Sequence, residues 1–367
     1  MMQTKIKDLM SFFNGWAPFE HQEKWDNSGL QIGHFEDAVH ACLICLDVTE
    51  EIVEEAIQKK ANVIISHHPL IFGAIKSITG KNMVERIIQK AILNQINIIS
   101  LHTNLDHQWH GVNAEIGKRI GLKNLEILKP LTNTLVQLTY FVTADVHERV
   151  KDAIFDAGGG RIGNYQECSF TTEGTGTYMP IDEAQPVVGE MDQRSTVEEL
   201  EVKVLVHSHV LNKVLDALRT SHKYEEVAYF IQALDNKNQT LGSGMVGELE
   251  EAMHVTDFLN HLKRVFGCQV IRHTKINQSE IKKVAYCGGS GSFLLREALA
   301  QKADIFVTGD YKYHDFFDAE NRIIIADIGH FESEQFTINL IGDVLTKNFS
   351  NFAIHLTGIN TNPINYF

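Results

Sequence analysis

The sequence predicts an α/β protein with a duplicated, two-lobe core and an inserted ferredoxin-like α+β domain. Short apolar strands alternate with helices before residue 130, and the same rhythm returns after residue 236. Between them, the segment follows a βαββαβ order, which is the ferredoxin-like pattern. We therefore expect a first lobe at residues 1–130, an insert at 131–235 and a second lobe at 236–367. The 367 residues are enough for this many parts.

The first lobe contains three apolar segments that predict buried strands. They lie at residues 40–46, 63–65 and 96–101. The middle segment is an unbroken β-branched run, which is typical of a strand buried on both faces. A helix beginning at Thr49 and another near residues 81–94 separate the strands. This alternation predicts a parallel sheet built from βαβ units.

The insert has its own strand and helix pattern. In chain order we expect a strand at 134–142, a helix at 145–157, strand-like pieces on either side of 173–177, a strand at 201–206, a helix at 209–220 and a strand at 227–231. Because the two strand-to-helix junctions resemble each other, we interpret this segment as one compact domain.

The second lobe repeats the arrangement of the first. Its three apolar strands are expected at residues 283–287, 304–308 and 323–327, and each ends in polar or glycine-rich residues. The similar spacing suggests a weak internal duplication, with two lobes facing each other across their polar ends. The glycine-rich segment 288–292 is interpreted as a strand-to-helix turn, and an anion cradle at a helix N-terminus is the alternative.

The composition narrows the class of protein. Lys and Arg total 33 against 47 Asp and Glu, a net charge of −14, which argues against non-specific binding to nucleic acid or membranes. No apolar run is long enough to span a bilayer, so no membrane association is expected. Cys42 and Cys45 lie in an apolar strand and are interpreted as buried side chains rather than a redox pair. We expect a reducing, cytoplasmic location.

Two adjacent histidines provide the first indication of a functional site. His67 and His68 follow the strand at 63–65 and precede Pro69. Open α/β sheets place their sites at the carboxyl ends of such strands, and imidazole is the commonest metal ligand. The alternative is a pair of surface histidines with ordinary hydrogen bonds.

Three further residues complete a candidate ligand set. His330 and Glu334 are four residues apart at the start of a predicted helix, so they share one face, and Asp106 follows another strand. With His67 and His68 they provide three imidazoles and two carboxylates, a mixture that suits Zn, Mn or Fe better than Ca or Mg. Five ligands exceed the need of one tetrahedral zinc. We therefore expect two divalent ions bridged by one carboxylate, and metal-assisted hydrolysis or hydrolytic ring opening as the chemistry.

Other polar residues near strand ends are candidates for acid–base or orienting roles. They are His102, Asp310, His314 and Asp327. For each of them, a structural hydrogen bond is an equally good explanation. Trp25, beside Asp26, is interpreted as structural, with a place in the wall of a pocket as the alternative.

Seven motifs together carry a resemblance to a known family. They are Trp25 to Leu30, Ser66 to Pro69, His102 to Asp106, Gly288 to Ser292, Thr308 to Asp310, Tyr313 to His314, and Asp327 to Glu334. The sequence resembles the GTP cyclohydrolase I type 2 homologue family, also called the NIF-three-like family. The resemblance implies a dinuclear metal site at His67, His68, Asp106, His330 and Glu334. It also implies a ring-shaped homohexamer, and an insert similar to PII-like and CutA-like domains.

Two functional hypotheses follow from the sequence. The first is a dimetal hydrolase that acts on a small nucleotide-like or phosphorylated metabolite, with zinc as the expected metal and iron or manganese as alternatives. The second is a non-catalytic metal-binding ring whose insert senses a ligand or docks a partner. Loss of the site histidines should abolish turnover in the first case and leave ligand binding by the insert intact in the second.

Overall fold

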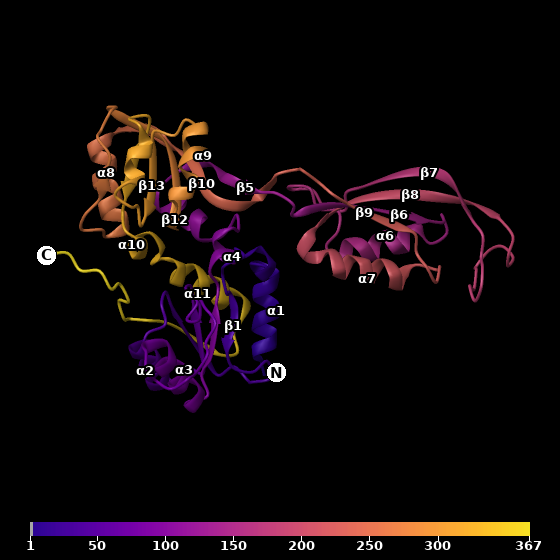
Figure 1. Cartoon of the computed structure of the whole chain (residues 1–367), viewed down its shortest axis with the longest axis horizontal. Coiled ribbons are helices and arrows are strands. Elements are labelled where there is room, and N and C mark those ends of the chain that lie inside the picture. The colour runs from indigo at the N-terminus through magenta and orange to yellow at the C-terminus, as the bar shows by residue number, and fades with distance from the viewer. Residues whose placement is uncertain (1–2) are drawn as a thin grey trace. The chain divides into compact units, whose positions relative to one another are not determined.

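The computed structural model describes residues 3–367, which form two compact units (Figure 1). The first unit contains the chain up to Lys129 together with Leu241–Phe367, and the second contains Pro130–Thr240. The predicted insert, residues 131–235, lies within the second unit. The first unit contains two sheets, which we call the first and second lobes.

The first lobe has a five-stranded sheet in the order β1-β4-β3-β2-β15. Its strands are β1 (Gly29–Ile32), β2 (Ala41–Cys45), β3 (Val63–Ser66), β4 (Asn97–Ser100) and β15 (Ala353–Leu356). Its helices are α1 (Ile6–Trp16), α2 (Glu50–Gln58), α3 (Met83–Leu93) and the short α4 (Thr103–Asp106). β2, β3 and β4 are parallel, as the sequence predicts, and β1 joins the edge antiparallel.

Alternate residues of these strands enter two separate cores. Leu43 and Ile64 face α2 and α3, whereas Ile44 and Ile65 face α1 and the core shared with the second lobe. Because both faces are covered, every position in the central strands is apolar or hydrogen-bonded, which explains the unbroken β-branched run. The polar residues at the strand ends are therefore the first that the sheet leaves outside its core.

The second lobe has a six-stranded sheet in the order β11-β14-β13-β12-β10-β5. Its strands are β5 (Lys123–Leu131), β10 (Asn238–His254), β11 (Arg272–His273), β12 (Glu280–Ser290), β13 (Ile305–Gly309) and β14 (Ile324–Asp327). Its helices are α5 (Val112–Ile120), α8 (Val255–Phe266), α9 (Leu295–Ala300), α10 (His330–Glu334) and α11 (Thr337–Asn348).

The two sheets repeat one arrangement, which supports the predicted duplication. In each, an antiparallel edge strand precedes three parallel strands, β1-β4-β3-β2 in the first lobe and β11-β14-β13-β12 in the second. The repeat ends there, because β2 is followed by parallel β15 and β12 by antiparallel β10. Since β15 follows α11, the C-terminal strand returns to complete the first sheet, a connection that the strand patterns do not reveal.

The glycine-rich segment departs from expectation. β12 continues through Gly288 and Gly289 to Ser290, with an irregular register between Tyr286 and Ser290. The segment is thus the irregular end of a strand, followed by a 3₁₀ turn at Ser292–Leu294, rather than a simple strand-to-helix turn. The two glycines consequently lie within hydrogen-bonding reach of the neighbouring elements.

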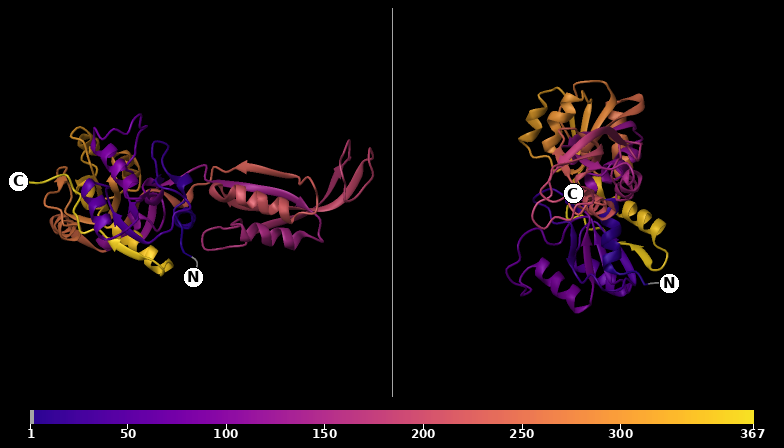
Figure 2. Two further views of the ribbon diagram at one scale, coloured as in Figure 1. Left: turned by 90° about the horizontal axis from the view of Figure 1, so that it is seen from below. Right: turned by 90° about the vertical axis from the view of Figure 1, so that its right-hand side faces the viewer.

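The second unit has the predicted βαββαβ order. Its elements are β6 (Leu135–Val142), α6 (His147–Asp156), β7 (Ser169–Tyr178), β8 (Ser195–His207), α7 (Leu211–Ser221) and β9 (Tyr229–Ala233). The sheet is antiparallel in the order β7-β8-β6-β9, and both helices pack on the same face of it (Figure 2). The prediction was wrong about residues 173–177, because β7 runs through them without a break.

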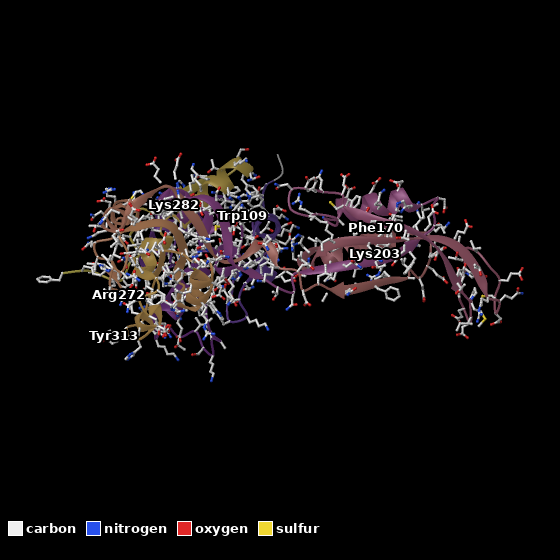
Figure 3. The ribbon with its side chains drawn as sticks, turned by 90° about the horizontal axis from the view of Figure 1, so that it is seen from above. Trp109, Phe170, Lys203, Arg272, Lys282 and Tyr313 are labelled. Carbon is white, nitrogen blue, oxygen red and sulfur yellow. The ribbon has the colours of Figure 1, made fainter. Side chains whose placement is uncertain are left out.

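The other face of this sheet carries exposed aromatic side chains. Phe170 lies opposite Lys203 in the register of β7 and β8, and both are labelled in Figure 3. Phe230 on β9 contacts Phe141 on β6, with ring centroids 6.0 Å apart. Across the described part of the chain, no helix is both long and apolar enough to cross a membrane.

Candidate metal centre

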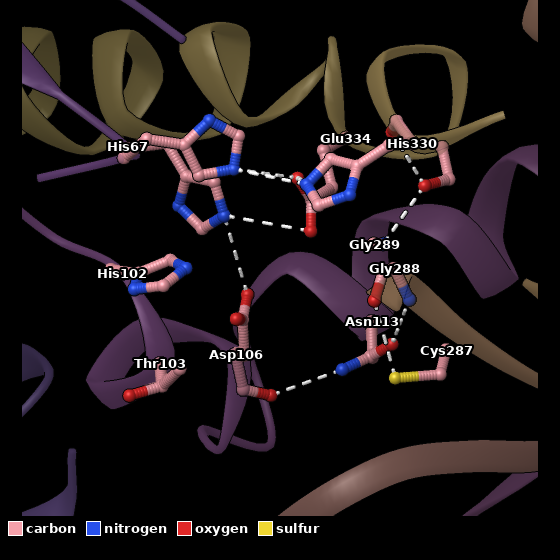
Figure 4. A network of polar contacts seen from close by, with 12 residues as sticks. His67, His102, Thr103, Asp106, Asn113, Cys287, Gly288, Gly289, His330 and Glu334 are labelled. Carbon is pink, nitrogen blue, oxygen red and sulfur yellow. Dashed lines mark hydrogen bonds and ion pairs between the residues drawn. The ribbon is translucent and has the colours of Figure 1, made fainter. Parts of the chain in front are cut away.

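The structure brings all five predicted ligands together where the polar strand ends of the two lobes meet. Figure 4 labels four of them, His67, Asp106, His330 and Glu334. His67 and His68 follow β3, and Asp106 ends the short helix α4 after β4. His330 and Glu334 occupy the first and last positions of α10, which follows β14 of the second lobe.

Glu334 divides the cluster into two groups of possible ligands. Its Oε1 lies 3.8 Å from His67 Nε2, which is itself 3.6 Å from Asp106 Oδ1. Its Oε2 lies 3.0 Å from both His68 Nε2 and His330 Nε2. In each group, the possible ligand atoms lie within 4.8 Å of one another. One carboxylate therefore presents one oxygen to each group.

Hydrogen bonds fix the orientation of the two first-lobe histidines. His67 Nδ1 donates to the carbonyl oxygen of Leu101 at 2.7 Å, and His68 Nδ1 donates to Asp47 at 2.7 Å. A proton held on Nδ1 leaves the Nε2 lone pair free, which is the form in which imidazole binds metals. Asp47 in turn accepts from Thr361 at 2.8 Å. Asp47 was not among the predicted site residues, although it is an acid shortly after the buried strand β2.

His330 is oriented in the same way from the second lobe. Its Nδ1 donates to Asp310 Oδ2 at 2.7 Å. Asp310 follows β13 and has a left-handed backbone, with φ of 54°, which is uncommon outside glycine. The predicted orienting role of Asp310 agrees with this contact. A strained backbone that places a side chain on a possible ligand is a recurrent feature of functional sites.

The irregular end of β12 packs against Glu334. Gly289 has φ of 60°, and a Cβ atom built on it would lie only 2.4 Å from Glu334 Oε1. Its backbone N–H donates to Ser333 Oγ at 2.9 Å. Glycine is therefore favoured here, both by the backbone conformation and by the close approach of the carboxylate.

Asn113, which was not among the predicted site residues, contacts both lobes beside the centre. Its Nδ2 donates to the carbonyl of Asp106 at 3.1 Å, and its Oδ1 accepts from the backbone N–H of Gly288 at 3.0 Å (Figure 4). The side chain is 2% exposed. An asparagine in the first turn of a helix gives no signal in the sequence that it lies between two lobes.

His102 faces the same centre. Its Nδ1 donates to Asp26 Oδ1 at 2.8 Å, and one of its ring nitrogens lies within 4.8 Å of the His67 and His68 nitrogens. Asp26 also accepts from the backbone N–H of Thr103 at 3.1 Å and from the hydroxyl of that residue. His102 therefore shares the orientation device of His68 and His330, although it was not among the predicted ligands.

Two other candidates lie elsewhere. His314 occupies an exposed turn where its ring contacts Tyr313, and the three possible ligand groups among residues 3–367 do not include it. Asp327 pairs with Arg272 and accepts from the backbone N–H of Tyr311 at 2.9 Å. These contacts give Asp327 a structural part in holding the segment that follows β13.

The carboxylates of the centre favour the positively charged form of its histidines. Burial would lower the pKa of His68, but its hydrogen bonds with Asp47 and Glu334 raise that pKa to about 9. Burial opposes charge on His330 as well, yet Glu334 and Asp310 raise its pKa to about 11. Burial alone would raise the pKa of Glu334, and the charge of His330 nevertheless holds it well below its usual range. A divalent cation would compete with these protons for the same atoms.

Unpaired buried atoms show that the donor set fits a cation. Among the described residues, His67 Nε2 and Asp106 Oδ1 are buried and have no hydrogen-bond partner, although they face each other. His68 Nε2 and His330 Nε2 lie 3.2 Å apart and each lies 3.0 Å from Glu334 Oε2, so three possible ligand atoms face one point. Leaving buried polar atoms unpaired costs about 1–3 kcal/mol each, and cations among them would remove that cost.

The fold and this cluster define an α/β protein with two similar lobes and a possible metal-binding centre of histidines and carboxylates between them. The chain belongs to the Duf34/NIF3 (NGG1p interacting factor 3) family, whose model matches residues 4–363. This confirms the family resemblance found in the sequence.

Named relatives cover nearly the whole chain. The GTP cyclohydrolase 1 type 2 homolog of Staphylococcus epidermidis is 35% identical over 367 residues, which span 99% of this chain and 100% of the relative. The protein of the same name from Halalkalibacterium halodurans is 38% identical over 324 residues, 88% of this chain and 87% of its own.

Solved structures agree with the fold. A Bacillus cereus protein related to NIF3 is 37% identical and superposes with a TM-score of 0.86, covering 100% of both chains. A Staphylococcus aureus protein is 31% identical with a TM-score of 0.80, again over 100% of both chains. The fold of the whole chain is therefore similar to that of these two proteins.

Proposed function

We propose that this protein is a metal-dependent hydrolase that holds two divalent ions and acts on a small nucleotide-like or phosphorylated metabolite. The observation that carries the proposal is the placement of Glu334, whose two oxygens face two separate groups of ligand atoms. Zinc is the expected metal, because imidazole and carboxylate ligands suit it, with iron or manganese as alternatives.

The relatives support the choice of substrate class. Two of them carry the name GTP cyclohydrolase 1 type 2 homolog, which refers to the hydrolytic opening of a nucleotide ring. By analogy, a nucleotide or another phosphorylated compound is the first class of substrate to test in this chain.

Different side chains would bind the ions and transfer protons. His67, Asp106 and Glu334 would hold one ion, and His68, His330 and Glu334 the other. When bound, the ions would supply Lewis acidity to the centre. His102 keeps a proton on Nδ1 through Asp26, which leaves Nε2 to accept or donate a proton at a reacting group.

Metal analysis of variants tests the arrangement of ligands. Protein purified without added metal should contain about two ions per chain. Glu334→Ala should lose both, whereas Asp106→Ala or His330→Ala should lose one each. Glu332→Ala is the matched control, because Glu332 lies on the same helix but contacts Asn362. A single ion that survives Glu334→Ala would contradict the two-ion arrangement.

An activity screen then tests catalysis. Nucleotides and phosphoesters would be incubated with the protein, with and without a chelator. We expect turnover that the chelator abolishes and that His67→Ala removes. Ligand binding without turnover, retained in His67→Ala, would instead favour the non-catalytic ring with a ligand-sensing insert.

We also propose a homo-oligomer, with a hexamer as the expected stoichiometry. The single chain exposes large apolar side chains on α3, including Ile92 at 57% and Leu93 at 82% of their surface. Adjacent exposed apolar side chains commonly mark contact surfaces between chains. Light scattering of the purified protein would measure the mass, and a monomer at micromolar concentration would contradict the proposal.

A further inference from the structure

Two large aromatic side chains are exposed beside the candidate metal centre. Trp25 is 61% exposed and Phe72 is 53% exposed. Trp25, for which the sequence predicts a structural role or a place in a pocket wall, therefore exposes more than half of its surface. Since water contact of such rings is unfavourable, covering them with a ligand would gain free energy in proportion to the area covered.

Both rings contact His102. The Trp25 and His102 ring centroids are 5.7 Å apart with the planes at 72°, and the Phe72 and His102 centroids are 5.7 Å apart with the planes at 89°. The His102 ring lies 5.4 Å from those of both His67 and His68. The His102 ring thus contacts both the two site histidines and the two aromatic rings, so a molecule bound at the centre would be close to both aromatic rings.

The loops that carry the two rings are tied together. Asn27 Nδ2 donates to the carbonyl of Ile71 at 2.7 Å, and the backbone N–H of Ile71 donates to Gln31 Oε1 at 2.9 Å. Trp25 immediately precedes Asp26, which is fixed by His102. Phe72 immediately follows Ile71. The backbone that carries the two rings is therefore held in place before any ligand arrives, which reduces the entropy lost on binding.

We infer that Trp25 and Phe72, the aromatic frame, select ligands in which a planar aromatic ring is attached close to an oxyanion. The oxyanion would bind at the centre and the ring would pack against the frame. This inference rests on the proposed function, because the centre supplies the anion-binding half of the site. Aromatic pairs prefer offset or edge-to-face contact, and a fixed frame favours flat rings over flexible chains.

Phosphonates test the inference without interference from turnover, since they have no ester bond to hydrolyse. Binding of phenylphosphonate and ethylphosphonate to zinc-loaded full-length protein would be measured by calorimetry. We expect phenylphosphonate to bind about tenfold more tightly. Trp25→Ala and Phe72→Ala should each weaken phenylphosphonate roughly three- to tenfold and leave ethylphosphonate within about twofold.

Phe35→Ala provides the matched control. Phe35 is also 53% exposed, but it follows the end of β1 that pairs with the start of β4, at the opposite end of the sheet from His102. It should leave both affinities unchanged. Phe72→Leu keeps an apolar side chain but no ring, so it should weaken phenylphosphonate binding less than Phe72→Ala does, by the part of the contact that depends on an aromatic ring.

Several results would overturn the aromatic frame. They are equal affinity for both phosphonates in the unmodified protein, equal weakening of both by the frame variants, and no phenylphosphonate binding to protein shown to hold zinc. The zinc content of each sample separates these results from a failure of the metal centre. Absence of turnover in the activity screen would count against the hydrolase and leave this binding comparison intact.

Discussion

Gly289→Ala offers the sharpest test of how the candidate centre is built. The added Cβ would lie 2.4 Å from Glu334 Oε1, 3.2 Å from Glu334 Cδ and 3.3 Å from His330 Cε1. Ordinary contact begins at 3.4 Å, so the carboxylate has to retreat by about 1 Å. Because Glu334 lies in both ligand groups, the displacement should affect both ions.

The expected magnitude has two separable parts. An alanine at φ of 60° carries backbone strain of about 1–2 kcal/mol, which lowers the free energy of unfolding. Disturbing the residues that support a metal ligand typically weakens metal affinity by about 10–100-fold. We therefore expect a modest loss of stability in the metal-free protein and a large loss of zinc affinity.

Gly267→Ala separates the two parts. Gly267 has φ of 65°, close to that of Gly289, but a Cβ built there has nothing within 4 Å. This variant should show the strain without the loss of zinc affinity. Thermal unfolding of metal-free protein and competition with a chromogenic chelator measure the two quantities. Zinc affinity of Gly289→Ala within twofold of the unmodified protein would refute the proposed support of Glu334.

Three further predictions follow from the same structure. Asp47→Ala should weaken zinc affinity about 10–100-fold in the chelator competition, because His68 loses its orienting partner, and unchanged affinity would refute that role. Glu85 accepts hydrogen bonds from Thr79, which lower its pKa to about 2. Its charge therefore stabilises the fold fully above the unfolded-state pKa of about 4.3, and this stabilisation is lost as the pH falls towards 2. The difference in Tm between the unmodified protein and Glu85→Gln should therefore shrink from pH 6 to pH 3, and a constant difference would contradict it. Ile65→Ala removes a fully buried side chain and should cost about 2–5 kcal/mol in denaturant unfolding, with a loss below about 1 kcal/mol contradicting the packing of β3.

Sequence patterns predicted the elements best where the local signal and the tertiary environment coincide. The apolar run of β3 and the helix α3 were found close to their observed bounds, because burial on both faces demands β-branched residues and a helix needs an apolar stripe. The predictions were wrong at the glycines of β7 and β12. Glycine usually interrupts a strand, but here partner strands hold the chain extended through it.

The orienting residues were the harder part of the site. Asp26 accepts a hydrogen bond from His102, which lies 76 residues later in the chain, and Asp47 accepts one from His68, which lies 21 residues later. Only folding brings these partners together. Such contacts leave no spacing pattern in one sequence. Asp310 was found only because it also lies at a strand end.

The sequence by itself determined the fold class, the family resemblance and the five candidate ligands, because strand ends in open α/β sheets are where polar residues collect. Only the tertiary structure decided how those residues meet. It set one Glu334 oxygen against each ligand group, placed Asn113 between the lobes and left Trp25 and Phe72 exposed beside His102. These contacts join residues far apart in the chain, so neither local backbone preferences nor the hydrophobic periodicity of the sequence can predict them.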